Sequence, residues 1–235
     1  MTTQDDVPPL DICGLPYPHD PARYCTRRSG HRPRHLHQTA RSEQWVVKPR
    51  GVLYLVACAA PPAADLATPI RGAQELGWDV CVIVTPSVHR WATEDPDSGI
   101  DLDALAELTG YPVRHTYKLP SEPDLLPSPD ALLVAPMTNN TVNKWAAGVS
   151  DTLALGLITE AIGLDRPIIA LPHFNRAQAA HPAVNASVAT LRGAGVNVLL
   201  GEGGFVPHEP RTSDRHAYPW LAALAALPTL PAERD

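Results

Sequence analysis

The sequence of 235 residues is poor in aromatic residues and cysteine, and it has no long apolar run. It contains only two phenylalanines, but 44% of its residues are hydrophobic, so a sizeable core can be buried and global disorder is excluded. No stretch approaches the roughly 18 apolar residues of a membrane-spanning helix, which argues against a membrane protein. The four cysteines are too few for a disulfide scaffold at this size. The start, MTTQDDVPPLD, lacks a charged segment followed by an apolar one, so we expect no secretory signal and a cytoplasmic protein.

The sequence is unusually rich in proline, and its charges are unevenly distributed along the chain. Proline occurs 26 times, about 11% of residues against roughly 5% on average. The net charge is −6, but residues 1–50 hold eight lysines and arginines against five acids, so the basic charge is concentrated at one end. A net acidic body without a long basic run argues against a dedicated nucleic-acid-binding protein.

Residues 1–49 form a Pro-, His- and Arg-rich arm without a sustained apolar period, and we expect this arm to be poorly ordered. Five of its side chains could in principle supply four zinc ligands: Cys13, Cys25, His31, His35 and His37. Their spacing, C-x11-C-x5-H-x3-H, lacks the short Cys pair that is usual in zinc knuckles. We therefore predict no metal site.

From residue 50 the pattern changes to alternating strands and helices. Continuous apolar runs predict buried strands at 52–60, 80–85, 131–136, 167–172 and 197–200. Apolar residues at helical spacing predict helices at 63–77, 101–109 and 182–193, and one of about 20 residues from the turn at 138–141 to Gly163. This order predicts an α/β fold, a doubly wound parallel sheet in three layers spanning 50–205. A C-terminal extension, 206–235, contains a short amphipathic helix in 218–227 that could pack on the body.

Ligands of such sheets bind outside the carboxyl ends of the strands, so the residues after each strand are the candidate site. They lie in 58–64, 85–89, 136–141 and 172–175. No GxGxxG follows the first strand, which excludes the ordinary dinucleotide fingerprint. In the run CAAPPAAD, however, Ala59 and Ala60 let the backbone approach a ligand closely.

Hydroxyl and carboxamide side chains gather after two of the other predicted strands. Thr85 and Ser87 follow the second strand, and hydroxyls beside free helix N–H groups suit a phosphate monoester. After the third strand come Pro136, Met137 and the segment Thr138-Asn139-Asn140-Thr141. One asparagine could be a helix N-cap, but two flanked by threonines offer more donors and acceptors than a cap requires.

The segment APMTNNTVNKWAAGVSDTLALGLI (135–158) resembles the characteristic segment of the homo-oligomeric FMN-containing cysteine decarboxylases. That family includes phosphopantothenoylcysteine decarboxylase and the peptidyl-cysteine decarboxylases of lantibiotic biosynthesis. The positions in register are Pro136, Asn140, Thr141, Lys144, Gly148 and Asp151. Pro172-His173-Phe174-Asn175 stands where the family has Pro-x-Met-Asn, and His115 stands where it has an active-site histidine. The resemblance covers about residues 50–201.

The resemblance implies a flavodoxin-like (Rossmann-like) fold that binds FMN and acts as a carbon–carbon lyase. It implies that Asn140 contacts the substrate carboxylate and the flavin, that Asn175 helps bind the carboxylate, and that His115 is the base or proton relay at the thiol. The cofactor-binding residues would be Ala59, Ala60, Thr85, Ser87, Pro136, Thr138, Asn140 and Thr141. The substrate would be a small thiol carboxylate or the cysteine end of a peptide. The expected assembly is a homotrimer or a multiple of one, with FMN between subunits and His115 from the neighbouring chain.

Three departures from the family pattern leave alternatives open. Cys58-Ala59-Ala60 replaces the usual Gly-Ser after the first strand, and residues 174–179 replace the family's Met-Asn-x-x-Met-Trp. The segment GEGGFVPHEP (201–210) lacks the reductive cysteine of the coenzyme A enzymes. The complete coenzyme A reaction is therefore not expected. A flavin-binding regulatory or redox protein that does not decarboxylate is the alternative, and a chain that has lost FMN is a third possibility.

Overall fold

The structure, a computed structural model, describes residues 51–230 and four short strands nearer the N-terminus. These strands form two antiparallel pairs: β1 (Pro16–Tyr17) with β2 (Asp20–Tyr24), and β3 (Leu36–Gln38) with β4 (Gln44–Val46). The rest of the arm, including four of the five candidate zinc ligands, lies outside the described residues. The side chain of the fifth, His37 in β3, is also not described, so the expectations for the arm stay predictions.

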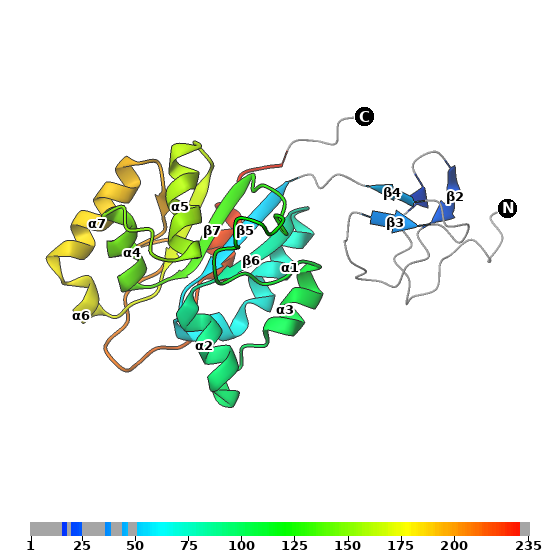
Figure 1. Cartoon of the computed structure of the whole chain (residues 1–235). Coiled ribbons are helices and arrows are strands. Elements are labelled where there is room, and N and C mark those ends of the chain that lie inside the picture. Colours follow the sequence, from blue (N-terminus) through cyan, green and yellow to red (C-terminus); the bar gives the residue numbers. More distant parts are fainter. Residues whose placement is uncertain (1–15, 18–19, 25–35, 39–43, 47–50, 231–235) are drawn as a thin grey trace.

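The body contains one parallel sheet of five strands, in the order β6-β5-β7-β8-β9. The strands are β5 (Val52–Ala57), β6 (Asp79–Val84), β7 (Ala131–Met137), β8 (Ile168–Pro172) and β9 (Asn197–Val198). The order reverses between β5 and β7, because the chain first adds β6 on one side of β5 and then continues on the other (Figure 1). This is the predicted doubly wound, flavodoxin-like sheet, and each expected strand is present.

Helices cover both faces of the sheet, because successive side chains of each strand point to opposite faces. On one face Leu53 and Leu55 pack with α1, α3 and α8, and on the other Tyr54 and Val56 pack with α4, α5 and α7 (Figure 1). The α-helices are α1 (Ala67–Glu75), α2 (Pro86–Glu94), α3 (Leu102–Thr109), α4 (Asn139–Ala146), α5 (Leu153–Gly163), α6 (Arg176–Ala179), α7 (Pro182–Gly193) and α8 (Trp220–Ala225). Two 3-10 helices, Pro61–Asp65 and Pro96–Ser98, precede α1 and follow α2.

The prediction of a single helix between 138 and 163 is wrong, because the structure has two helices there, α4 and α5. Gly148 adopts a φ of 73°, which ends α4 in a left-handed turn that glycine adopts without steric cost. Thr152 then starts α5 by accepting a hydrogen bond from the backbone N–H of Leu155 at 3.3 Å. The break follows from these local signals, which the continuous apolar pattern of the segment masks.

The segment after β9 packs on the same body as the sheet. Tyr218 donates a hydrogen bond from its hydroxyl to the backbone oxygen of Leu171 in β8, at 2.6 Å. Trp220 of α8 is 5% exposed and belongs to the core cluster that contains α1. The amphipathic helix expected near the C-terminus therefore exists, and it covers the α1 side of the sheet.

We expect Trp220→Ala to lower the free energy of unfolding by about 3–5 kcal/mol, because it removes a buried aromatic side chain and leaves a cavity. Leu221, the next residue of α8, is 81% exposed, so Leu221→Ala is a matched control that should change stability by less than about 0.5 kcal/mol. Urea unfolding followed by circular dichroism measures both values. Equal effects of the two substitutions would show that α8 does not pack as described.

Candidate functional site

A cavity of about 870 Å³ lies at the carboxyl edge of the sheet. Its walls come from the segments that follow β5, β6, β7 and β8, together with α5 and the loop after β9. The volume falls within the roughly 300–1,000 Å³ range of small-molecule and cofactor sites. The edge predicted to hold the site therefore carries a cavity of suitable size.

Two backbone hydrogen bonds connect the end of β7 to the loops that follow β5 and β8. The N–H of Cys58 donates to the oxygen of Pro136 at 3.0 Å, and the N–H of His173 donates to the oxygen of Met137 at 2.8 Å. Pro136 itself is buried in β7 and is not one of the residues that line the cavity. It thus fixes the loop after β5 through its backbone, while Ala59 and Ala60 of that loop line the cavity as expected.

Thr138 and Thr141 form a small hydrogen-bond network at the start of α4. The hydroxyl of Thr138 caps the helix by accepting from the N–H of Thr141 at 3.4 Å, and the two hydroxyls are 3.1 Å apart. Thr141 donates its hydroxyl proton to the sulfur of Cys58 at 3.1 Å. Burial raises the pKa of the Cys58 thiol, so this cysteine is a protonated wall residue. Both threonines line the cavity as predicted, and they also hold α4 against β5.

Asn139 and Asn140 have different environments although they are adjacent. Asn139 accepts a hydrogen bond from the side-chain amide of Asn143 at 3.2 Å, and Asn143 accepts one from Ser187 of α7 at 2.8 Å. Asn140 is exposed at the cavity, and its carboxamide has no hydrogen-bond partner among the described residues. Of the two asparagines, Asn140 is therefore the one available to a ligand.

Asn175 lies at the cavity and also caps a helix. Its side-chain oxygen accepts from the N–H of Gln178 at 2.9 Å, and the Gln178 side chain accepts from the N–H of Asn175 at 3.1 Å. This reciprocal capping box fixes the asparagine at the start of α6. Its amide nitrogen has no partner among the described residues, so it can donate to a ligand in the cavity.

The loop after β6 brings two hydroxyls to the N-terminus of α2. Thr85 occupies the N-cap position but makes no capping hydrogen bond, and its hydroxyl oxygen is buried without a partner among the described residues. Ser87 is exposed and lines the same cavity. With Pro86 at the first helical position, this end of the nine-residue helix offers free N–H groups and two hydroxyls to an anion.

The sequence analysis placed His173 at the candidate edge without giving it a role, and it missed His208 and Ser213, which also line the cavity. His173 is 7% exposed, and its Nε2 lies 3.1 Å from the hydroxyl of Ser213. The His208 ring lies 5.2 Å from the His173 ring, measured between centroids. Ser213 and His208 belong to the segment after β9, which carries no recognisable strand or helix pattern, so the sequence offered no signal that it reaches the site.

His115, the predicted base, lies outside this cavity. Its ring stacks on that of His89 in α2, with 3.5 Å between centroids, and it lines a separate cavity of about 510 Å³ formed by residues 113–125. Burial, His89 and Arg114 lower the pKa of His115. Within one chain, the structure thus brings Asn140 and Asn175 together but leaves His115 apart from both.

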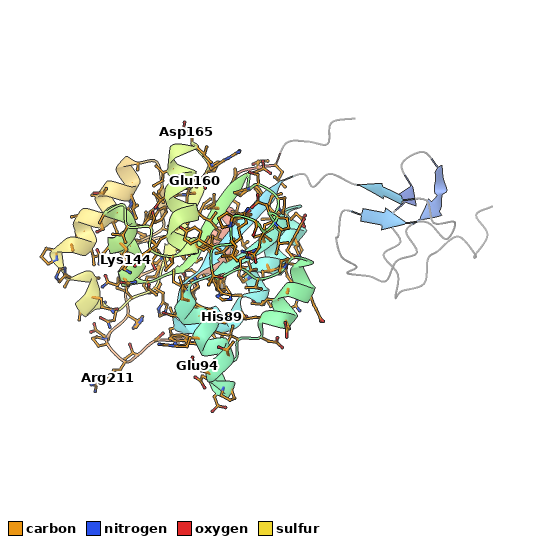
Figure 2. All side chains as sticks on the ribbon, in the orientation of Figure 1. His89, Glu94, Lys144, Glu160, Asp165 and Arg211 are labelled. Atoms are coloured by element: carbon orange, nitrogen blue, oxygen red, sulfur yellow. The ribbon has the colours of Figure 1, made fainter. Side chains whose placement is uncertain are left out.

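Cationic side chains are scarce in the cavity. Among its described lining residues only one is a lysine or arginine, Lys144 of α4, and it pairs with Asp151. Figure 2 shows Lys144 on α4, His89 on α2 and Arg211 on the loop after β9. No group of three or more His, Cys, Asp or Glu side chains suited to a metal ion occurs in the described part of the chain. The cavity is therefore lined mainly by neutral polar and small apolar residues.

The sequence profile of the family described as Flavoprotein matches residues 70–215, more than half of the chain. The chain belongs to the flavoprotein family. It is 36% identical over 124 residues to phosphopantothenoylcysteine decarboxylase of Mus musculus, a match that covers 51% of this chain and 57% of the mouse protein. This flavoprotein spans between about a quarter and just over half of the length of the curated relatives that it matches.

Two solved structures resemble this flavoprotein in fold. The cypemycin decarboxylase CypD matches with a TM-score of 0.55 and 23% identity, covering 75% of this chain and 90% of that protein. The FMN-binding protein AtHal3 matches with a TM-score of 0.54 and 16% identity, covering 75% and 94%. At these identities they establish the shared fold. No helix in the described ranges is long and apolar enough to cross a membrane.

We expect the stability of this flavoprotein to fall between pH 6.5 and pH 4, in part because of His173. Burial, with His208 nearby, lowers the pKa of His173 to about 4, whereas an unfolded histidine titrates near 6.5. In this window the unfolded chain binds more protons, so acid favours unfolding, with an upper limit of about 3 kcal/mol from this group.

The measurement is urea unfolding of the wild type and of His173→Gln at pH 7 and pH 4.5. The wild type should lose more stability than the variant on acidification, because glutamine does not titrate. His216→Gln, at an exposed histidine outside the cavity, should retain the wild-type pH dependence. An identical pH dependence of His173→Gln and wild type contradicts the neutral, buried state of His173.

Proposed function

We propose that this flavoprotein binds FMN in the strand-end cavity and catalyses the oxidative decarboxylation of a cysteine-type thiol. The observation that carries the proposal is the free Asn140 carboxamide in the same cavity as the unpartnered Thr85 hydroxyl. Family membership and the relationship to a curated decarboxylase support it. The cytoplasmic location expected from the sequence stays a prediction.

The cavity residues fit FMN. The buried Thr85 hydroxyl, the Ser87 hydroxyl and the N-terminus of α2 suit a phosphate without a cationic side chain. Ala59 and Ala60 leave room for the isoalloxazine or ribityl part near the backbone, and Thr138 and Thr141 supply hydroxyls at the next strand. The absent Gly-Ser after β5 is thus compensated by hydroxyls from β6 and β7. FMN, when bound, supplies an acceptor for two electrons and a proton.

The chain itself binds and orients the substrate. In this proposal Asn140 and the amide nitrogen of Asn175 donate to the substrate carboxylate. Neutral donors are suited to this task, because a lysine or arginine would stabilise the charged carboxylate more than the transition state in which its charge is lost. The only lysine of the cavity pairs with Asp151, which removes it from competition for the carboxylate.

A flavin-binding protein that does not decarboxylate remains the second candidate. It is favoured by the wall after β8, where Phe174 is 2% exposed and α6 continues with Arg176, Ala177 and Gln178 in place of a Met and Trp clamp. The free Asn140 carboxamide favours the enzyme instead, because a protein that only holds FMN has no need of a carboxylate-binding group.

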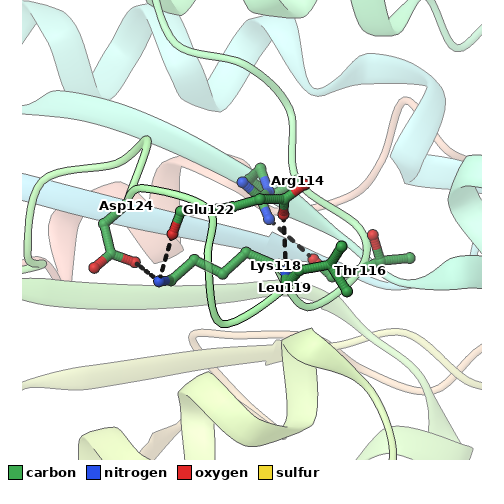
Figure 3. Close-up of polar contacts among 6 residues, drawn as sticks. All are labelled: Arg114, Thr116, Lys118, Leu119, Glu122 and Asp124. Atoms are coloured by element: carbon green, nitrogen blue, oxygen red, sulfur yellow. Dashed lines mark hydrogen bonds and ion pairs between the residues drawn. The ribbon is translucent and has the colours of Figure 1, made fainter.

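We further propose that copies of the chain associate through the surface that carries His115, as a homotrimer or a multiple of one. The turn at 114–124 is held by its own polar contacts (Figure 3). Lys118 donates to the backbone oxygen of Glu122 at 2.9 Å and pairs with Asp124 at 3.4 Å. The side chain of Glu122 accepts from the N–H of Leu119 at 2.8 Å.

This turn presents an apolar patch, because Tyr117, Leu119 and Leu125 are between 51% and 64% exposed. A second copy would cover the patch. The hydroxyl of Tyr117 packs against Gly156 of α5 in the same chain, where an added Cβ would lie 1.9 Å from its oxygen. Association here would also place His115 of one copy at a subunit boundary. From this boundary, His115 of one copy would reach the cavity of the neighbouring copy.

The proposed function is tested by the absorption spectrum of the purified protein, followed by turnover. We expect flavin bands, release of FMN on denaturation, and CO2 from Cys-terminal peptides when O2 is present to reoxidise the reduced FMN after each turnover. Asn140→Asp should reduce kcat/KM per bound FMN by about 10²–10³-fold, the usual cost of losing an oriented donor.

Asn139→Asp is the matched control, since this side chain already accepts a hydrogen bond from Asn143 and keeps that role as a carboxylate. A colourless protein that does not bind added FMN would contradict the proposal. FMN binding without turnover of any thiol carboxylate would favour the second candidate.

We expect Leu119→Asp to lower the molar mass of the assembly in analytical ultracentrifugation, because a carboxylate in the apolar patch must be desolvated when copies associate. Leu221→Asp, at an exposed position on α8, is the control that should leave the mass unchanged. A wild-type protein that sediments as a monomer would contradict the proposed association.

A further inference from the structure

His208 carries a free hydrogen-bond acceptor at the cavity. Its Nδ1 lies 2.7 Å from the backbone oxygen of Glu209, and a carbonyl oxygen only accepts, so Nδ1 carries the proton. In the neutral ring Nε2 is then an acceptor. This Nε2 is buried and has no partner among the described residues. A buried acceptor without a donor is costly, which makes it a strong binding point for a donor that enters the cavity.

The backbone holds this imidazole next to Asn175. The N–H of Arg176 donates to the oxygen of His208 at 2.8 Å, and Asn175 and His208 form a β-bridge. The guanidinium of Arg176 also pairs with the carboxylate of Glu209 at 2.9 Å. The start of α6 therefore positions both Asn175 and His208. The thiol and carboxylate of a cysteine are separated by two carbons, so a substrate that binds Asn175 through its carboxylate can extend its sulfur toward His208.

The other groups near His208 are less suited to accept a proton. His173 already has its Nε2 at the hydroxyl of Ser213, and burial lowers its pKa to about 4. Tyr218 donates its hydroxyl to Leu171, and burial raises the pKa of this phenol. His115 lies outside the cavity of its own chain and would reach a cavity only in a neighbouring copy. Among the imidazoles that line the described cavity, His208 is the one with a buried nitrogen that has no hydrogen-bond partner.

We propose that His208 is a catalytic residue that binds the substrate thiol through Nε2 and accepts its proton, an inference that rests on the proposed function. The S–H bond breaks, the electron pair stays on sulfur, and a new N–H bond forms on Nε2. No electron is transferred in this step. The imidazolium keeps its Nδ1–H bond to the oxygen of Glu209, and the neutral His173 beside it adds no opposing charge.

Two substitutions distinguish the role of Nε2 as proton acceptor from the role of Nδ1, which anchors the loop through Glu209. His208→Asn places an amide nitrogen near the position of Nδ1, so it can keep the bond to Glu209 but has no Nε2. His208→Gln places a polar atom near Nε2 that cannot take up a proton. Both should lower kcat/KM by about 10²–10⁴-fold, the usual contribution of a general base, with FMN content and melting temperature unchanged. His216→Gln, on the same loop but outside the cavity, should match the wild type.

The pH profile gives a readout that a purely structural role would not change. The acid limb of kcat/KM should disappear in both His208 variants and persist in His216→Gln. The charged and titratable groups around His208 are His173, Glu209 and Arg176. His173→Gln should keep the acid limb if His208 is its source. An acid limb that persists in the His208 variants and disappears only in His115→Gln overturns the proposal and leaves the decarboxylase function intact.

A measurement without turnover separates this proposal from the proposed function. The full chain, labelled with ¹⁵N-histidine, is titrated with a synthetic tripeptide ending in cysteine and with the same tripeptide ending in serine, a residue whose hydroxyl does not ionise. With the cysteine peptide, the Nε2 resonance of His208 should move to the protonated range, and the serine peptide should leave Nε2 unprotonated. This shift in a protein that releases no CO2 supports the role of His208 and contradicts the decarboxylase. No response of His208 to the cysteine peptide overturns the proposal.

Discussion

The position of β7 between β5 and β8 is the constraint on which the site depends. Its last residues accept hydrogen bonds from the first residues of both neighbouring loops, at Cys58 and at His173. These two bonds bring the ends of three strands to one edge, with the Thr138 network and Asn140 between the two loops. Because the parallel strands are buried on both faces, their backbone cannot shift without breaking packing on two sides. The cavity is therefore part of a rigid edge rather than of a free loop.

The chemistry of the cavity follows from its shortage of charge. Its polar groups are hydroxyls, carboxamides and imidazoles, and its lysine is paired with Asp151. Such a lining can hold a phosphate through the N-terminus of α2 and a carboxylate through amide donors, without fixing a carboxylate as a strong ion pair. It is also a lining in which a neutral imidazole keeps a lone pair available. The proposed decarboxylation needs these properties together, and here three loops and the segment after β9 supply them.

The sequence was a good guide wherever a residue acts near its own strand. Thr85, Ser87, Asn140 and Asn175 follow buried apolar runs directly, so the rule for parallel sheets placed all four at the cavity that the structure contains. The sequence did not indicate that His208 and Ser213 line the cavity, because they reach it from an irregular segment more than 25 residues beyond Asn175. Nothing in their spacing indicates contact with α6, because that contact is made by backbone hydrogen bonds and one ion pair. The resemblance assigned His115 to the site of a neighbouring chain, and the structure places it outside the cavity of its own chain.

Local pattern and composition by themselves determined the order of the five strands, the doubly wound sheet and the edge at which the site lies. They could do so because continuous apolar runs and helical periods report burial directly, and because the carboxyl ends of parallel strands share one edge. Only the tertiary structure decided that the segment after β9 completes the cavity, and that Asn140 is free while Asn139 is bound. These outcomes depend on contacts between residues far apart in the chain, such as His208 with Arg176 and Cys58 with Thr141, whose energies no local pattern of residues encodes.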